Sequence, residues 1–228
     1  PRSGAIIKQL AGTQADRIEQ LGYYRVTELH IDGVAVRVAR TGYTGEVGYE
    51  LMAPASAATA LWERLLDIGQ REGLVPCGLA ARDSLRLEAA MALYGHELTR
   101  DMAPVDVGLG RVVKEHRFVG GQALAGRPQQ WELYGLAGAG RRAARAGCAI
   151  RLDGEEIGIV TSGILSPTLG HPIALARARP GLPLGTGVEV DVRGQTLPMT
   201  TVPLPFYTRE SRANQPVSDH HLTTMEET

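Results

Sequence analysis

The chain has 228 residues, of which 43% are hydrophobic and 21% charged, and its 24 Lys and Arg residues nearly balance 25 Asp and Glu residues. This composition is typical of a globular protein of one or two domains and excludes a wholly disordered chain. The near-neutral charge provides no basic field for nucleic acid or an anionic membrane, and no apolar stretch approaches the roughly 18 residues of a membrane helix. We therefore expect neither a nucleic-acid nor a membrane partner. Two cysteines are too few for a disulfide framework.

The first part of the chain predicts a mixture of helices and strands. Apolar spacing predicts two short helices within residues 3–21. Alternation in residues 23–31 and 34–40, with an Asp-Gly pair between them, predicts a β-hairpin. Two longer helices are predicted at residues 54–73 and 79–92, each bounded by Gly or Pro.

The second part of the chain changes texture and predicts an all-β domain. Residues 101–110 read as a loop, residues 111–114 as a short strand and residues 118–124 as a turn into a short helix. Short strands separated by turn residues follow, at 133–136, 148–152, 157–162, 173–177, 188–192 and 200–203. Strands of this length and spacing are typical of a small barrel or sandwich. The polar residues after Arg209 predict a disordered tail.

A glycine-rich loop between two predicted strands is the first candidate site. Residues 40–50 read Arg-Thr-Gly-Tyr-Thr-Gly-Glu-Val-Gly-Tyr-Glu. Glycines let the backbone approach a flat ligand, Tyr43 and Tyr49 could stack on it or hydrogen-bond to it, and Glu50 begins a strand. The alternative is a plain turn with surface carboxylates. The loop has neither of the glycine patterns that bind phosphate.

Two arginines in the second long helix form the other candidate site. Arg82 and Arg86 are four residues apart and share a helix face. Arg82 could bind a carboxylate ligand with its planar fork of donors. Spacing alone favours the alternative, an internal ion pair of either arginine with a nearby carboxylate, from Asp83, Glu88 or Glu50.

The remaining polar residues indicate neither a metal site nor a nucleophilic triad. None of the six histidines pairs with another at ligand spacing in the part expected to fold. Ser162 lacks the strand-turn-helix context of a nucleophile elbow. Cys77 precedes a predicted helix, which could activate its thiol, but a buried structural cysteine is the favoured interpretation. We expect no bound metal.

Several sequence blocks resemble the aminomethyltransferase family, the T-protein of the glycine cleavage system. They occur in the family's order over residues 1 to about 209. The blocks are RTGYTGE (40–46) with GYE (48–50), GLAARDSLRLEA (78–89), LYGHE (93–97), PVDVGLG (104–110), GIVTSG (158–163), SPTLG (166–170) and LPFY (204–207).

The resemblance implies an α+β fold. It corresponds to the C-terminal two-thirds of a three-lobed folate-binding aminomethyltransferase fold that ends in a small β-barrel. Residues 1–128 would form the folate-binding domain, incomplete at its N-terminus. Residues 129–210 would form the barrel domain and residues 211–228 a disordered tail.

The resemblance also implies an activity and its partners. Family members move an aminomethyl group from the lipoyl arm of a carrier, the H protein, to tetrahydrofolate, with release of ammonia. Tetrahydrofolate would be the one-carbon acceptor, and no metal is required. A bacterial cytoplasm or a mitochondrial matrix would fit such a protein.

Five residues match family positions at the folate site. Glu50 corresponds to the carboxylate that accepts the adjacent N–H donors of the pterin ring, and Arg82 to the folate-site arginine. Tyr43 resembles a tyrosine that contacts the ring or its linker. Met91 and Tyr207 are further candidates for folate contact.

The resemblance leaves this chain without a catalytic residue. The acidic residue that the family uses near folate N5 lies in a region that would precede Pro1, so we assign no catalytic residue and expect the chain alone to be inactive. Two alternatives remain open. One is the folate-binding portion of a sarcosine- or dimethylglycine-type dehydrogenase or demethylase, and the other is a non-catalytic folate-binding protein. A folate-binding relative in iron–sulfur cluster maturation is disfavoured because its Lys-Gly-Cys-Tyr-x-Gly-Gln motif is absent.

Overall fold

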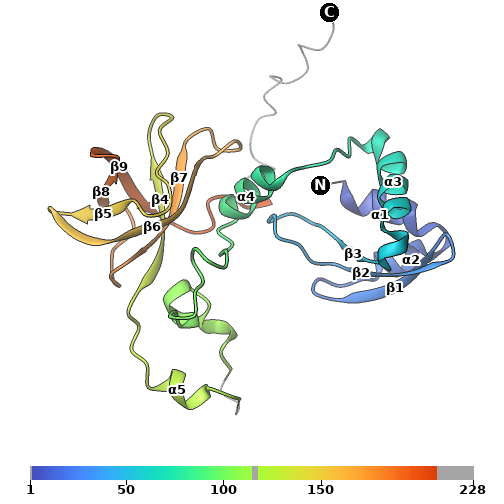
Figure 1. Ribbon diagram of the computed structural model, residues 1–228, viewed down its shortest axis with the longest axis horizontal. Helices are drawn as coiled ribbons and strands as arrows, with labels where there is room; N and C mark the ends of the chain where they lie inside the picture. The colour runs from blue at the N-terminus through green and yellow to red at the C-terminus, as the bar shows by residue number, and fades with distance from the viewer. Residues whose placement is uncertain (1, 115–117, 210–228) are drawn as a thin grey trace, which may run out of the picture.

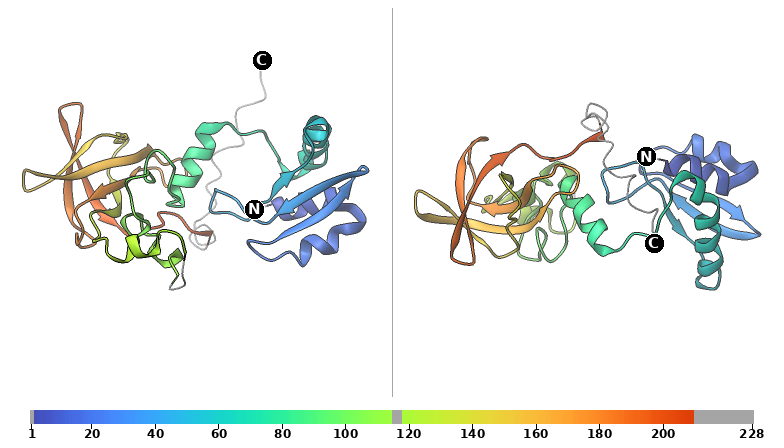
Figure 2. Two further views of the ribbon diagram at one scale, coloured as in Figure 1. Left: turned by 60° about the horizontal axis from the view of Figure 1, so that its bottom comes forward. Right: turned by 90° about the horizontal axis from the view of Figure 1, so that it is seen from above.

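The computed structural model describes residues 2–114 and 118–209, which combine helices and sheets (Figure 1). An N-terminal lobe consists of α1 (Ser3–Ala11), α2 (Ala15–Glu19), β1 (Val26–Ile31), β2 (Val34–Ala39), β3 (Glu50–Met52) and α3 (Ala58–Gly69). Helix α4 (Leu79–Glu88) lies between this lobe and a C-terminal β-barrel in every view (Figure 2). The two short helices and the hairpin of the N-terminal lobe were predicted from the sequence.

The hairpin of β1 and β2 shows why the sequence forms this sheet. Its register pairs Ile31 with Val34, so Asp32 and Gly33 alone make the turn. Both turn residues have positive φ, 50° and 80°, as a type I′ turn requires. Alternation then buries one face, on which Leu29 is fully covered. This face shares one hydrophobic core with α1, α2 and α3.

The C-terminal barrel closes with the strand order β4-β7-β6-β5-β8-β9, and every neighbouring pair is antiparallel. Its strands are β4 (Glu132–Gly138), β5 (Ala149–Leu152), β6 (Glu155–Leu165), β7 (Pro172–Ala178), β8 (Gly187–Val192) and β9 (Gln195–Val202). Alternating apolar side chains fill its interior, with Leu136, Ile150 and Val160 almost completely buried. Closure leaves no unpaired sheet edge. Of the two predicted architectures, the barrel is therefore the one formed.

Helix α4 ends four residues earlier than predicted. The backbone turns left-handed at Ala90, with φ of 55°, and the Met91 N–H bonds the Arg86 carbonyl at 2.8 Å. This six-to-one bond is the Schellman closure, for which glycine is the usual residue in the left-handed position. The prediction extended the helix to residue 92 because the sequence offers no glycine before Gly95.

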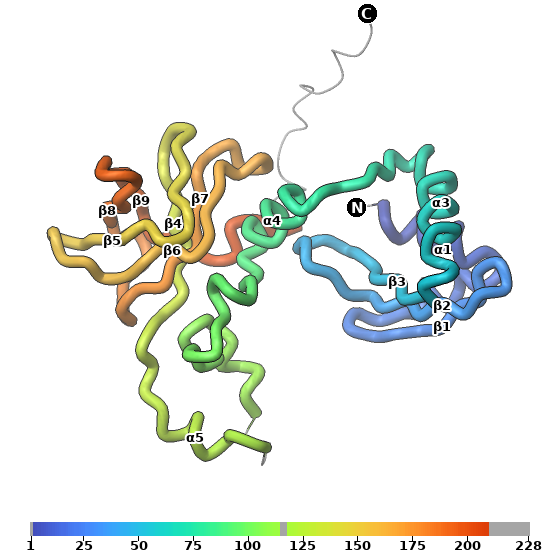
Figure 3. Tube along the Cα trace, viewed as in Figure 1, coloured from blue at the N-terminus to red at the C-terminus, as the bar shows by residue number. Residues whose placement is uncertain are grey.

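The chain makes an excursion between α4 and the barrel, described over residues 101–114 and 118–131 (Figure 3). The strand predicted at residues 111–114 is wrong, because a 3-10 turn occupies Gly110–Val112. Its valines had no partner strand to pair with, and Val112 remains 59% exposed. A short helix, α5 (Gly121–Ala125), follows as predicted. The predicted disordered tail lies outside the described residues.

Asp106 ties the two ends of this excursion together. Its buried carboxylate accepts backbone N–H groups from Ala103 at 2.9 Å, Gln130 at 3.0 Å and Trp131 at 3.3 Å. Burial alone would raise the pKa of Asp106, but these donors and the Arg127 guanidinium outweigh it and hold the pKa below its ordinary value.

Among the described residues, no helix has both the length and the apolar character needed to cross a bilayer.

We predict that Asp106→Asn destabilises the chain by about 2 kcal/mol at pH 7, because the amide replaces an acceptor with a donor. In the parent chain the contribution of Asp106 is complete above the unfolded pKa of about 3.9 and is lost as the pH falls through the lower folded pKa. The stability advantage of the parent over the variant should therefore begin to shrink as the pH falls below about 4, and it should be lost once the pH is below the folded pKa.

Urea unfolding at several pH values measures this difference. Asp191→Asn is the matched control, since Asp191 accepts a backbone N–H from Gly194 in an exposed turn. Equal stability of the parent and Asp106→Asn at pH 7 would contradict the assignment.

Candidate functional site

The glycine-rich loop between β2 and β3 reaches the end of α4. Gly45 has φ of +72°, and a Cβ built on it would lie 2.8 Å from the Ala89 Cβ. Only glycine permits both this conformation and this approach. The loop is therefore not a plain surface turn, because its backbone packs directly against the residue that ends α4.

Tyr43 joins the loop to the turn that follows α4. Its hydroxyl donates to the carbonyl of Ala92 at 2.6 Å and lies 3.3 Å from that of Met91. Burial raises the pKa of the Tyr43 hydroxyl above its ordinary value. Its ring lies against the side chain of Arg82, whose guanidinium carbon is 4.9 Å from the ring centroid.

Arg82 and Arg86 have different environments despite sharing a helix. Arg82 is exposed, and no described carboxylate lies within ion-pair distance of it. Arg86 is buried and pairs with Asp83 at 2.7 Å and with Glu97 at 3.0 Å. The predicted internal ion pair is therefore confirmed for Arg86. Arg82 keeps its donors for another partner.

Glu50 lies at the far end of the same loop, where it begins β3. Its backbone pairs with Ala39, and its exposed carboxylate accepts a hydrogen bond from the Thr41 hydroxyl. The loop is thus closed at its base by a contact between Thr41, near its start, and Glu50, at its end. The carboxylate is held by this contact but remains accessible to solvent.

The two further candidates take structural positions beside the loop. Met91 contributes its carbonyl to the contacts with Tyr43, and its side chain is partly buried. Tyr207 is buried; its hydroxyl donates to Glu46 at 2.5 Å and its N–H to the Glu88 carbonyl at 2.9 Å. The last described segment therefore returns from the barrel and fastens the glycine-rich loop.

Sequence reasoning did not single out Glu97, and it considered Glu88 only as a possible ion-pair partner of the two arginines. Glu97 is buried beside Arg86, and Glu88 accepts hydrogen bonds from Ser166 at 2.5 Å and from the Thr168 hydroxyl at 2.7 Å. Both glutamates lie inside the sequence blocks that carry the family resemblance. That position was the available signal, but spacing alone cannot reveal burial.

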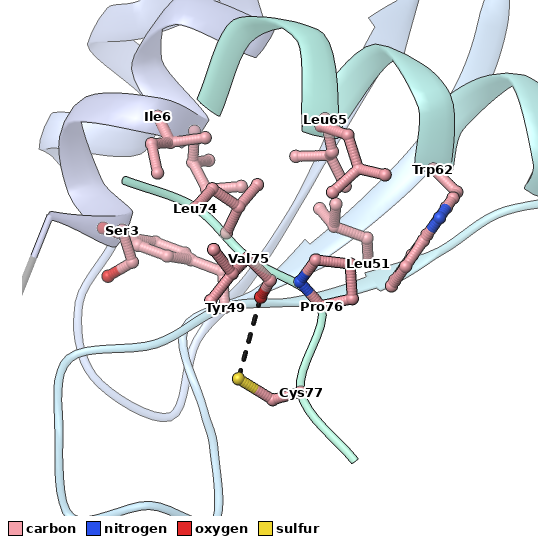
Figure 4. Close-up of a pocket in the computed structure, with 12 residues that line it drawn as sticks. Ser3, Ile6, Tyr49, Leu51, Trp62, Leu65, Leu74, Val75, Pro76 and Cys77 are labelled. Carbon is pink, nitrogen blue, oxygen red and sulfur yellow. Dashed lines mark hydrogen bonds between the residues drawn. The ribbon is translucent and has the colours of Figure 1, made fainter. Parts of the chain in front are cut away.

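A separate apolar groove of about 320 Å³ lies in the N-terminal lobe (Figure 4). None of its lining residues is charged: Ser3, Ile6, Ile7, Tyr49, Leu51, Trp62, Leu65, Leu66, Leu74, Val75, Pro76 and Cys77. Tyr49 lines this groove, whereas Tyr43 contacts α4.

Cys77 is exposed and its thiol lies 3.7 Å from the Val75 carbonyl, so the prediction of a buried cysteine is wrong. The residues on either side of Cys77, from Val75 to Leu79, are exposed as well.

The described part of the chain contains no cluster of three or more His, Cys, Asp or Glu side chains that could hold a metal ion.

The fold and this junction define an α+β protein with a C-terminal six-stranded barrel. Two family models match it, the GCVT N-terminal domain over residues 1–117 and the glycine cleavage T-protein C-terminal barrel domain over residues 132–208. The chain belongs to the glycine cleavage T-protein family.

Individual relatives agree with this assignment. Proteins named aminomethyltransferase from Cutibacterium acnes and Streptomyces avermitilis are 53% identical over 211 residues and 48% identical over 224 residues. The alignments cover 90% and 92% of this chain but only 57% and 59% of those proteins.

A solved structure supports the fold directly. The glycine cleavage system aminomethyltransferase T from Bartonella henselae superposes with a TM-score of 0.76 at 31% identity. The match covers 90% of this chain and 56% of that protein. The α+β fold ending in a β-barrel is confirmed, and the chain spans little more than half the length of these relatives.

We predict that Gly45→Ala destabilises the chain by about 2 kcal/mol, since the new methyl group would meet Ala89 in a backbone conformation unfavourable to alanine. Gly42→Ala is the matched control in the same loop, because a Cβ there meets no atom within 4 Å. Chemical unfolding of both variants measures the contrast. Equal stabilities would show that the loop does not pack against α4 as described.

Proposed function

We propose that this chain forms part of a tetrahydrofolate-dependent aminomethyltransferase of glycine cleavage. The observation that carries the proposal is the junction at which the Tyr43 ring lies against the free guanidinium of Arg82. An arginine that is exposed, unpaired with any described carboxylate and supported by an aromatic ring is suited to a carboxylate-bearing ligand. The names of the relatives support the choice of reaction.

The charged and aromatic side chains of the glycine-rich loop and α4 fit a reduced folate. The Glu50 carboxylate is exposed and fixed by Thr41, so it can accept the adjacent N–H donors of a pterin ring. Arg82 can bind a carboxylate of the folate tail, and Tyr43 offers an aromatic face beside Arg82. We assign Met91 and Tyr207 supporting positions. Bound tetrahydrofolate would accept the one-carbon unit, while these residues bind and orient it.

The remaining parts of the proposal follow the family. The lipoyl-bearing H protein would present the aminomethyl group, ammonia would leave, and a bacterial cytoplasm suits such a reaction. We propose that residues 1–128 belong to the folate-binding domain and residues 129–210 to the barrel domain. Because no catalytic acid is assigned within this chain, we expect it alone to turn over no aminomethyl donor.

We predict that the chain binds 5-formyltetrahydrofolate, a stable reduced folate, in isothermal titration calorimetry. Glu50→Gln should weaken binding by about tenfold to a hundredfold, because a neutral amide cannot accept two N–H donors in parallel. Arg82→Ala should weaken binding by a similar factor through loss of the charged donors.

Glu28→Gln is the matched control, since Glu28 is an exposed carboxylate on β1 that lies 3.9 Å from Arg37. It should bind the folate like the parent. Absence of binding to the folded parent chain, or equal affinity in the parent and Glu50→Gln, would overturn the proposed function.

A further inference from the structure

A buried ion pair, Arg86 with Glu97, hydrogen-bonds the backbone of the turn that follows α4. The Arg86 guanidinium donates to the Met91 carbonyl at 3.3 Å, and the Glu97 carboxylate accepts the Leu93 N–H at 2.9 Å. Arg86 and Glu97 also bond each other at 3.0 Å. Both side chains are almost completely buried, with 2% and 0% of their surface exposed. The pair therefore contacts the backbone of this turn at two points.

The outer side of the same turn binds Tyr43. Its hydroxyl contacts the carbonyls of Met91 and Ala92, so Arg86 and Tyr43 approach the Met91 carbonyl oxygen together. The Tyr43 ring in turn lies beside Arg82. A continuous chain of contacts thus runs from the buried ion pair, through a backbone carbonyl, to the exposed arginine.

We propose that Arg86 and Glu97 are positioning residues, which hold the turn after α4 so that Tyr43 is fixed against Arg82 in the folate site. The identity of the ligand in this inference rests on the proposed function, whereas the placement of Tyr43 by the buried pair does not. Neither residue is one of the proposed folate contacts. Arg86 acts through the Met91 carbonyl, and Glu97 acts through Arg86 and the Leu93 N–H.

The chemistry of the buried pair favours positioning over simple stabilisation. Burying two charges costs nearly as much as their attraction returns, so such pairs are poor sources of net stability. The Arg86 guanidinium also bonds Asp83 and the Ser162 hydroxyl of β6, at 2.8 Å and 2.7 Å. One rigid fork therefore fixes the turn relative to both α4 and the barrel, which a lysine ammonium cannot do with the same geometry.

Arg86→Lys tests the proposal because it keeps the charge and removes the fork. Tyr43 is observed by fluorine NMR after incorporation of 3-fluorotyrosine, and loss of a resonance in Tyr43→Phe assigns it among the seven tyrosines. We expect the Tyr43 resonance to shift in Arg86→Lys. The Arg86→Lys variant should bind 5-formyltetrahydrofolate about tenfold more weakly than the parent, the loss expected for one or two charge-assisted contacts.

Glu88→Gln is the matched control. Glu88 is another buried carboxylate that joins α4 to the barrel, but its carboxylate bonds Ser166 and Thr168 and touches neither Tyr43 nor the turn carbonyls. This variant should lose stability while the Tyr43 resonance stays unchanged. If Arg86 contributed to stability alone, the Tyr43 resonance would respond in the same way in Arg86→Lys and in Glu88→Gln.

Glu97→Asp provides a second test if Arg86→Lys does not fold, since it keeps the charge and withdraws the carboxylate by one methylene. An unchanged Tyr43 resonance in a folded Arg86→Lys or Glu97→Asp chain would overturn the proposal. A parent chain that binds no reduced folate would refute the proposed function, whereas the Tyr43 resonance would still decide whether this pair positions Tyr43.

Discussion

The buried guanidinium of Arg86 constrains the arrangement of α4, the barrel and the candidate site. It lies at the end of α4, bonds Glu97 at 3.0 Å and reaches the hydroxyl of Ser162 on β6 at 2.7 Å. A charge buried to this degree must keep its partners, because an unpaired ion in the interior costs several kcal/mol. The geometry therefore admits few relative placements of α4 and the barrel. The position of the Met91 carbonyl is restricted in the same way, because the same guanidinium bonds it.

The candidate site is assembled on this junction from three parts of the chain. The glycine-rich loop comes from the N-terminal lobe and packs against the end of α4 through Gly45. The segment after the barrel returns and bonds the same loop through Tyr207 and Glu46. Helix α4 supplies Arg82 at the point where these contacts converge. The loop is thus held by contacts with the other two parts of the chain.

Local patterns predicted the parts of the fold whose cause is local. The hairpin of β1 and β2 and the strands of the barrel follow from alternation and turn chemistry, which a sequence displays directly. The strand at residues 111–114 was wrongly predicted because valines alone do not make a strand without a neighbour. The end of α4 was misplaced because Ala90 adopts a conformation usual for glycine. Spacing also could not distinguish Arg82 from Arg86, because only Arg86 is buried and bonded to Ser162, a residue far away in the sequence.

The most direct measurement of this account is hydrogen exchange on the parent chain with and without 5-formyltetrahydrofolate. If the loop and the turn after α4 form one site, the ligand should slow exchange together in residues 41–50 and 89–93, because it bridges both segments. Protection should be absent from the apolar groove around residues 74–77. Protection confined to that groove, or to the barrel strands, would contradict the placement of the site at the junction of the loop and α4.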